Sequence, residues 1–203
     1  MVAGANFNFN GCQVYKGYLD RSEQLALLSE LRMIVSKAPL FSPLTPWGKP
    51  MSVKMTSAGK YGWYSDHKDY RYIPKHPNGT HWPEIPRSIQ AIWHDLCGDQ
   101  PNPECCLVNY YEKKAKMGLH QDKDEKNLMH PVLSISLGDD ALFRIGGQNK
   151  NDRTESIWLS SGDVLVMSGA SRLAYHGIDR IKYGSSQLLK SGGRLNLTLR
   201  VVD

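Results

Sequence analysis

The run RLNLTLR, from Arg194 to Arg200, alternates strictly between polar residues and leucine. Because side chains at i and i+2 of a β-strand share a face, the run predicts a strand with a polar face and a leucine face. A strand with one face in solvent would show the same alternation. However, the polar face carries two arginines and no acid, so their charge lacks an internal partner. A dicarboxylate would supply one, because guanidinium binds carboxylate through paired, charge-assisted hydrogen bonds.

The chain before this run has the pattern of a β-rich core. From Cys105 onward, short β runs are separated by glycine-containing turns, without helical crossovers between them. Such spacing is typical of an antiparallel sandwich or barrel. We expect strands at residues 106–111, 117–119, 132–137, 141–145, 156–159, 163–167 and 194–202.

Two earlier segments predict helices. Asp20 followed by Glu23 resembles a capping box, and apolar residues then recur until Pro39 at helical spacing, namely Leu25, Leu28, Leu31 and Val35. A second helix is expected from about Pro86 to Gly98, with an apolar face of Ile89, Ile92, Trp93 and Leu96. Residues 39–86 are rich in Pro, Gly and aromatic residues, so we interpret them as short strands and long loops. The whole chain is expected to form one domain.

Composition excludes several classes of protein. With 203 residues, five Trp and ten Tyr, the chain can bury one sizeable core and is not mainly disordered. No apolar run approaches the roughly 18 residues of a membrane span, and residues 1–6 lack the features of a secretory signal. We therefore expect a cytoplasmic protein with no membrane partner. We also expect the chain to be a monomer. The four cysteines (Cys12, Cys97, Cys105 and Cys106) are expected to be reduced and mostly buried.

Charge and motifs point to particular ligands. The 25 Lys and Arg exceed the 20 Asp and Glu, which suits a polyanionic partner but is also common in proteins that bind no nucleic acid. The motif His120-Gln121-Asp122 places an imidazole and a carboxylate on one side of an extended segment. With His176, which follows an expected strand at residues 173–175, they predict a 2-His-1-carboxylate iron site with open positions.

A rival pair, His67 and Asp69, has the same spacing. It lies in a polar, Tyr-rich segment without a clear β run. No comparable arginine-rich strand follows its own third candidate ligand, His120. We therefore favour the triad of His120, Asp122 and His176.

Several runs together resemble the AlkB family of Fe(II)- and 2-oxoglutarate-dependent dioxygenases. Four of them are LVNYY at residues 107–111, LHQDKDE at 119–125, SRLAYHG at 171–177 and RLNLTLR at 194–200. The earlier runs MSVKMT at residues 51–56, GW at 62–63 and YRY at 70–72 are also similar. The resemblance implies an α+β, mainly β fold: a double-stranded β-helix (jelly-roll) core at about 105–203, N-terminal helices and a nucleotide-recognition lid at about 45–85.

The resemblance also implies a role for each matching residue. Fe(II) is expected on His120, Asp122 and His176, with O2 and 2-oxoglutarate as co-substrates. Arg194 would bind the distal carboxylate of 2-oxoglutarate, and Arg200 would lie near the carboxylate that chelates the metal and take part in catalysis. Further co-substrate contacts are expected from Asn109, Tyr111, Asn196 and Thr198.

The implied substrate is an alkylated base in DNA, with RNA left open. Trp63 would stack on the base opposite His120, and Asp124 would face its exocyclic amine. Trp63 as a core aromatic and Asp124 as part of a solvated loop remain alternatives. Contacts to the nucleic acid are also expected from Tyr70, Arg71, Tyr72 and Lys150, where Lys150 keeps the charge but not the forked geometry of the family's arginine.

The implied reaction is oxidative demethylation of bases such as 1-methyladenine and 3-methylcytosine. It is coupled to decarboxylation of 2-oxoglutarate to succinate and releases formaldehyde. Two alternatives remain at this point. One is a 2-oxoglutarate oxygenase that acts on protein or lipid, against which Trp63, Tyr70 and Tyr72 argue. The other is a catalytically silent nucleic-acid-binding module, against which the complete triad and both arginines argue.

Overall fold

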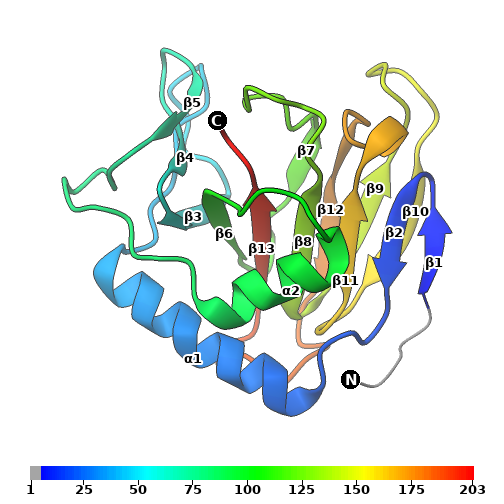
Figure 1. Ribbon diagram of the computed structural model, residues 1–203, viewed down its shortest axis with the longest axis horizontal. Coiled ribbons are helices and arrows are strands. Elements are labelled where there is room, and N and C mark those ends of the chain that lie inside the picture. Colours follow the sequence, from blue (N-terminus) through cyan, green and yellow to red (C-terminus); the bar gives the residue numbers. More distant parts are fainter. Residues whose placement is uncertain (1–5) are drawn as a thin grey trace.

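Two antiparallel sheets form the core in the computed structural model, which describes residues 6–203 (Figure 1). The prediction that residues 1–6 form no secretory signal falls mainly on residues 1–5, which lie outside the described residues. The larger sheet has seven strands in the order β1 (Asn6–Phe9), β2 (Cys12–Tyr15), β11 (Val164–Met167), β8 (Val132–Gly138), β13 (Arg194–Arg200), β6 (Cys105–Tyr111) and β3 (Val53–Gly59).

The smaller sheet has four strands and lies across from the larger one. Its order is β10 (Glu155–Leu159), β9 (Asp140–Ile145), β12 (His176–Lys182) and β7 (Met117–His120). The seven strands predicted between residues 106 and 202 for the β-rich core are confirmed, with small differences at the ends. This mainly β fold is the predicted jelly roll. Strands β1, β2 and β12 were not predicted.

The strand expected at residues 173–175 is wrong. The short 3-10 helix Gly169–Ser171 precedes this segment. Successive backbone bonds from Ser171 to Ser168, from Arg172 to Gly169 and from Ala174 to Ser171 curl the chain. These local i to i−3 bonds keep the chain in turns as far as Ala174. Tyr175 then donates to Gly147 and accepts from Gly146, and strand β12 begins at His176.

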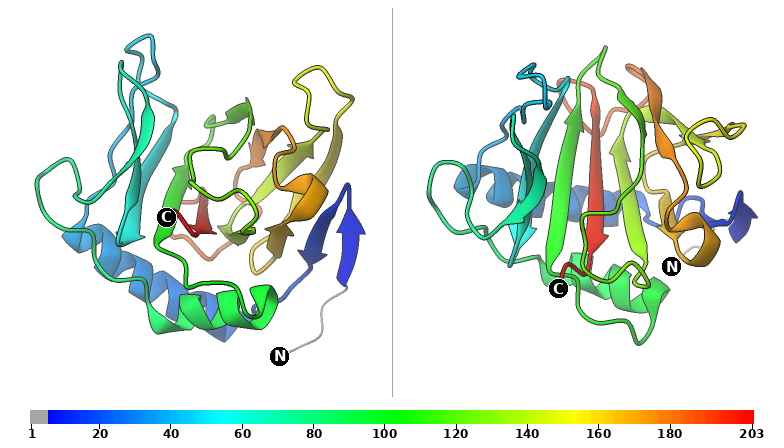
Figure 2. Two further views of the ribbon diagram at one scale, coloured as in Figure 1. Left: turned by 45° about the horizontal axis from the view of Figure 1, so that its top comes forward. Right: turned by 90° about the horizontal axis from the view of Figure 1, so that it is seen from above.

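Two helices cover the outer face of the larger sheet, α1 (Arg21–Lys37) and α2 (Arg87–Cys97) (Figures 1 and 2). The predicted capping box is confirmed, because Asp20 accepts from the Glu23 amide at 2.9 Å and Glu23 accepts from the Asp20 amide at 2.7 Å. The buried face of α1 differs from the predicted one. Leu25 is 49% exposed, and the buried residues are Gln24, Leu27, Leu28, Leu31 and Ile34.

Strand β13 separates two regions of the core. Its leucines pack with α1 and α2, while the opposite face of the larger sheet packs against the smaller sheet through a second apolar cluster. All seven residues of β13 are buried, so the alternative of a solvent-facing strand is wrong. Apolar burial on the leucine face holds the strand. This fixes its polar side chains between the two sheets.

A separate hairpin of β4 (Gly62–Ser65) and β5 (Tyr70–Ile73) stands beside the core (Figure 2). It contains the aromatic residues expected to contact the substrate. Within the predicted lid of residues 45–85, β3 instead belongs to the edge of the larger sheet. The segment predicted to be a lid is therefore divided, because β3 belongs to the larger sheet while the β4–β5 hairpin forms a sheet of its own.

Two expectations from composition can be compared with residues 6–203. All four cysteines are free thiols, and three of them are buried. Among the helices of this part of the chain, neither is long and apolar enough to span a membrane.

Candidate active site

Pairing of β7 with β12 brings the two predicted histidine ligands together. His176 lies directly opposite His120 in the antiparallel register, and the centroids of their rings are 4.5 Å apart. Gly177 permits this approach, because a Cβ there would lie 2.5 Å from the carbonyl oxygen of Met117. The pairing explains how two histidines far apart in sequence become neighbours.

Asp122, two residues beyond the end of β7, completes the triad. Its carboxylate oxygens lie 3.7 Å from Nε2 of His120 and 3.9 Å from Nε2 of His176. One ligand atom from each residue lies within 4.8 Å of the others, and within residues 6–203 no other group of three such side chains meets this condition. Two imidazoles and one carboxylate are the donor set of non-haem Fe(II) sites, so the residues fit this metal.

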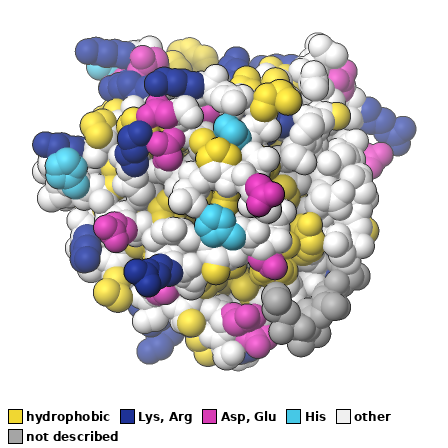
Figure 3. All heavy atoms as spheres, viewed as in Figure 1, with side chains coloured by type: hydrophobic (Ala, Val, Ile, Leu, Met, Phe, Trp, Pro, Cys, Tyr) yellow, Lys and Arg dark blue, Asp and Glu magenta, His cyan; other side chains and the backbone are white. Residues whose placement is uncertain are grey.

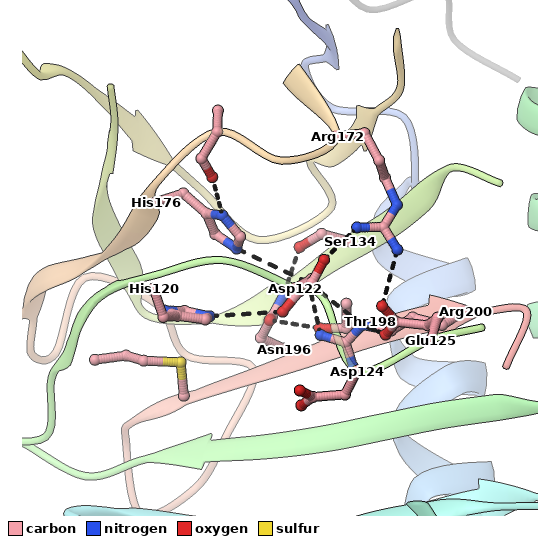
Figure 4. Close-up of polar contacts among 12 residues, drawn as sticks. His120, Asp122, Asp124, Glu125, Ser134, Arg172, His176, Asn196, Thr198 and Arg200 are labelled. Atoms are coloured by element: carbon pink, nitrogen blue, oxygen red, sulfur yellow. Dashed lines mark hydrogen bonds and ion pairs between the residues drawn. The ribbon is translucent and has the colours of Figure 1, made fainter. Parts of the chain in front are cut away.

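Both imidazoles are oriented for metal binding. Nδ1 of His120 donates to the carbonyl oxygen of Gly118 at 2.9 Å, and Nδ1 of His176 donates to that of Ala174 at 3.0 Å. These bonds leave Nε2 of each ring free towards Asp122 (Figure 4). Burial, together with the neighbouring His120, lowers the pKa of His176 to about 4. His176 is therefore neutral at pH 7 and can offer a lone pair.

Arg200 is paired inside the protein, contrary to the prediction that its charge lacks an internal partner. Its Nη2 donates to Asp122 at 2.8 Å, and its Nε lies 3.3 Å from Glu125. Burial alone would raise the pKa of Asp122, but the charge of Arg200 and the two histidines lower it. The sequence pattern missed this pairing because the acids come from a loop and not from the strand face itself.

Arg194, at the other end of the same strand face, fits the prediction of an unpaired cation. Only its Nη2 has a partner, the hydroxyl of Ser136 at 2.9 Å, whereas Nε and Nη1 are buried without one. Buried donors without partners are costly, so this end of β13 is built for a ligand. A carboxylate could accept from both free positions.

Two residues of β6, Tyr111 and Asn109, pair with residues of this polar face of β13. Tyr111 is opposite Arg194 in the register, and its ring lies 5.6 Å from the guanidinium carbon. Burial raises the pKa of Tyr111 to about 12, so its hydroxyl remains a donor at neutral pH. The amide oxygen of Asn109 is buried and has no partner. The guanidinium of Arg194 and the phenol of Tyr111 can both donate to a 2-oxoglutarate carboxylate, whereas the free oxygen of Asn109 is an acceptor and calls for a donor instead.

Asn196 and Thr198 lie on the same face but are already bonded. Asn196 donates to Ser134 at 2.7 Å and to the carbonyl oxygen of Ile135 at 3.0 Å, and it accepts from Thr198 at 3.2 Å. Their contact with the co-substrate stays a prediction. In this structure they brace the strand between Arg194 and Arg200.

A buried ion pair that no sequence pattern predicted lies beside the triad. Arg172 donates to Glu125 at 2.9 Å, and the two side chains are 3% and 1% exposed. Both residues fall inside runs that resemble the AlkB family, but no local pattern distinguishes a buried charge from a surface one. The hydrogen bonds of Arg172 and Glu125 point towards the loop that carries Asp122 (Figure 4).

The predicted substrate residues of the hairpin contact that same loop. Trp63 stacks on Tyr70, with ring centroids 5.5 Å apart, and its indole N–H donates to Asp124 at 2.8 Å. The hydroxyl of Tyr72 donates to Glu125. Tyr70, Tyr72 and Asp124 also help to line a hollow of about 280 Å³. The structure thus brings the hairpin aromatics beside the metal-ligand loop.

Two more residues predicted to contact the substrate are Arg71 and Lys150. Within residues 6–203 neither makes a hydrogen bond or ion pair to the loop that carries Asp122. Arg71 pairs with Asp66 at 2.8 Å and with Asp69, so the hairpin loop already engages it. Lys150 is exposed in the loop between β9 and β10. In the rival pair of possible metal ligands, His67 is also exposed, and Asp69 accepts a hydrogen bond from Arg71. Substrate contacts of Arg71 and Lys150 stay predictions.

Comparison with known proteins agrees with this geometry. Residues 11–200 match the family model described as the 2OG-Fe(II) oxygenase superfamily. A solved structure, that of OsALKBH1, superposes with a TM-score of 0.83 at 30% sequence identity and covers 97% of this chain and 99% of its own. The fold and the site are those of an Fe(II)- and 2-oxoglutarate-dependent dioxygenase.

Curated relatives narrow the assignment. An alpha-ketoglutarate-dependent dioxygenase AlkB homolog from Caulobacter vibrioides is 50% identical over 94% of this chain and 87% of its own length. The alpha-ketoglutarate-dependent dioxygenase AlkB of Escherichia coli is 40% identical over 86% of this chain and 82% of its own. Within the superfamily, the chain therefore belongs to the AlkB family.

Proposed function

We propose that this dioxygenase demethylates N-alkylated bases in nucleic acid and thereby repairs alkylation damage. The observation that carries the proposal is the attachment of the aromatic hairpin to the metal-ligand loop through Trp63–Asp124 and Tyr72–Glu125. A base can reach a buried metal only after it leaves its stack, and it then needs an aromatic surface to hold it. Trp63 and Tyr70 supply such a surface next to the loop that carries Asp122.

The carboxylate of Asp124 supports a cationic lesion. Bases such as 1-methyladenine and 3-methylcytosine carry a positive charge, which an adjacent carboxylate stabilises. Asp124 is exposed and bonds the Trp63 indole through one oxygen, so the other can accept from an exocyclic amine. Lys and Arg side chains line the upper edge of the molecule, interspersed with acids, where a phosphate backbone can contact them (Figure 3).

The site residues have different roles in the reaction. Bound Fe(II) supplies the oxidative chemistry, using O2 and the electrons released when 2-oxoglutarate is decarboxylated to succinate. His120, Asp122 and His176 hold the metal, and Arg194 orients the distal carboxylate of the co-substrate. The methyl group, once hydroxylated, leaves as formaldehyde. We assign co-substrate contacts also to Asn109, Tyr111, Asn196, Thr198 and Arg200, and substrate contacts to Trp63, Tyr70, Arg71, Tyr72, Asp124 and Lys150.

Mass spectrometry of a methylated single-stranded DNA oligonucleotide tests the proposal. After incubation with Fe(II), 2-oxoglutarate and ascorbate, we expect loss of one methyl group together with matching amounts of succinate and formaldehyde. The variant His120→Ala serves as the inactive control. Parallel reactions with RNA and with duplex DNA determine the preferred nucleic acid. Turnover of 2-oxoglutarate that is equal with and without methylated oligonucleotide would instead favour a protein or lipid substrate.

Binding measurements test the aromatic surface separately. Trp63→Ala should weaken binding of the methylated oligonucleotide by ~1–3 kcal/mol, the usual contribution of a base stacked on an aromatic ring. Trp47 is 83% exposed and provides a matched control, because Trp47→Ala removes the same side chain elsewhere. Equal losses in the two variants would contradict a specific role for Trp63.

We further propose that residues 45–85 act as a lid over a catalytic core of residues 105–203, in a cytoplasmic monomer. The observation that β4 and β5 form a separate two-stranded sheet supports the proposal of a lid. Light scattering of the purified protein should give the mass of one chain, and cell fractionation should recover it in the cytoplasmic fraction.

A further inference from the structure

A buried arginine holds the loop of the carboxylate ligand at three points. Arg172 donates through Nε to the carbonyl oxygen of His130 at 2.8 Å, through Nη1 to that of Asp122 at 2.5 Å, and through Nη2 to Glu125 at 2.9 Å. All three contacts fall on the segment from Asp122 to His130. The guanidinium therefore closes this loop into one shape.

Arg172 also belongs to the segment that leads to the third ligand. It lies in the turn between the 3-10 helix and β12, four residues before His176. One side chain thus connects the segment before His176 to the loop of Asp122, as Figure 4 shows. β-Sheet pairing positions only the two histidines relative to each other. Asp122 lies outside the strands, so its position depends on other contacts.

Glu125 supplies the counter-charge and a second connection. Its side chain is 1% exposed and accepts from Arg172, lies 3.3 Å from Arg200, and accepts from the hydroxyl of Tyr72. Arg200 in turn donates to the Asp122 carboxylate. Asp122 is therefore held by its backbone through Arg172 and by its side chain through Arg200, and Glu125 joins both arginines.

We propose that Arg172 and Glu125 are positioning residues that hold Asp122 in the geometry required for metal binding. They touch neither substrate nor co-substrate in this role. A ligand carboxylate bound by well-placed neighbours loses little freedom when the metal arrives, and loss of such neighbours typically lowers metal affinity by about 10- to 100-fold. The inference rests on the metal site and not on the identity of the substrate.

Titration of the metal-free protein with Co(II), followed by visible absorption, tests the proposal. Arg172→Met should raise the Kd for Co(II) by about 10- to 100-fold and alter the absorption bands. Arg172→Lys keeps the charge but cannot make three planar contacts, so an intermediate Kd is expected. Glu125→Gln preserves the shape and should also raise the Kd. Because it is nearly isosteric, it serves as the test if Arg172→Met fails to fold.

A matched control separates positioning from general stability. Asp163 is another buried carboxylate, paired with Lys16, and it bonds none of the three ligands. Asp163→Asn should lower the melting temperature but leave the Kd for Co(II) and its spectrum unchanged.

The double variant Arg172→Met with Glu125→Gln should bind Co(II) about as well as the weaker single variant, because the two residues act through one loop. Wild-type affinity and spectrum in Arg172→Met, or an equal loss of affinity in Asp163→Asn, would overturn the proposal. Since no nucleic acid is present, these outcomes are independent of whether the protein demethylates bases.

Discussion

Each end of β13 places an arginine on the same buried face. The charge of Arg200 is neutralised by acids of the protein, whereas that of Arg194 is not. At one end Arg200 is paired with acids, and although burial alone would lower its pKa, Asp122, Tyr72 and Glu125 raise it. At the other end no carboxylate contacts Arg194 within the described residues, and burial lowers its pKa. A buried arginine can therefore complete the protein or await a ligand, and only its neighbours decide which.

The largest effect is expected from removing the carboxylate at the Arg200 end. Asp122→Ala deletes one of three metal ligands and leaves Arg200 with less counter-charge, so turnover should fall to background. Oligonucleotide binding should survive, because the hairpin aromatics are untouched. Demethylation assays combined with fluorescence binding provide the measurement. Simultaneous loss of binding would mean that Asp122 supports the hairpin as well as the metal.

Arg200→Met should destabilise the metal-free protein by about 3 kcal/mol, because it strips a partner from two buried carboxylates. Arg194→Met should change the free energy of unfolding by less than about 1 kcal/mol, since the free Arg194 already has buried donors without partners. Urea denaturation of both variants measures the contrast. An equal loss of unfolding free energy in the two variants would contradict the distinction between Arg200 and Arg194.

For the affinity for 2-oxoglutarate, in contrast to the free energy of unfolding, we expect a large effect of the Arg194 variant. Arg194→Met removes the charged group that binds the distal carboxylate, which should cost about 2–4 kcal/mol and raise the Kd for 2-oxoglutarate roughly 30- to 700-fold. Anaerobic titration of metal-loaded protein gives this Kd directly. An unchanged value would refute the assignment of Arg194 as the carboxylate ligand.

A smaller effect concerns pH. The pKa of His176 falls from 6.5 to about 4 in the folded protein. Between these values the unfolded chain binds a proton that the folded chain does not, so the free energy of unfolding rises with pH. Acidifying metal-free protein from pH 7 to pH 5 should therefore cost about 2 kcal/mol through this residue. His176→Gln should show a correspondingly flatter pH profile in urea denaturation, and parallel profiles would contradict the shift.

Local patterns in the sequence predicted most elements that the structure contains. The capping box of α1, the apolar face of α2 and the strands after Cys105 follow from short-range periodicity. The prediction that failed also rested on a short stretch of sequence. Strand β12 was not predicted, and the strand expected at residues 173–175 does not form, because the apolar pattern there does not reveal that the chain turns at Arg172 and Leu173.

By itself, the sequence determined which side chains share a face of β13 and which residue types could bind iron and a dicarboxylate. These depend on the two-residue period of a strand and on the chemistry of the donors. Only the tertiary structure decided that Asp122 and Glu125 neutralise Arg200, that Arg194 keeps free donors, and that Arg172 holds the ligand loop. Such pairings join segments far apart in the chain, and no local period encodes them.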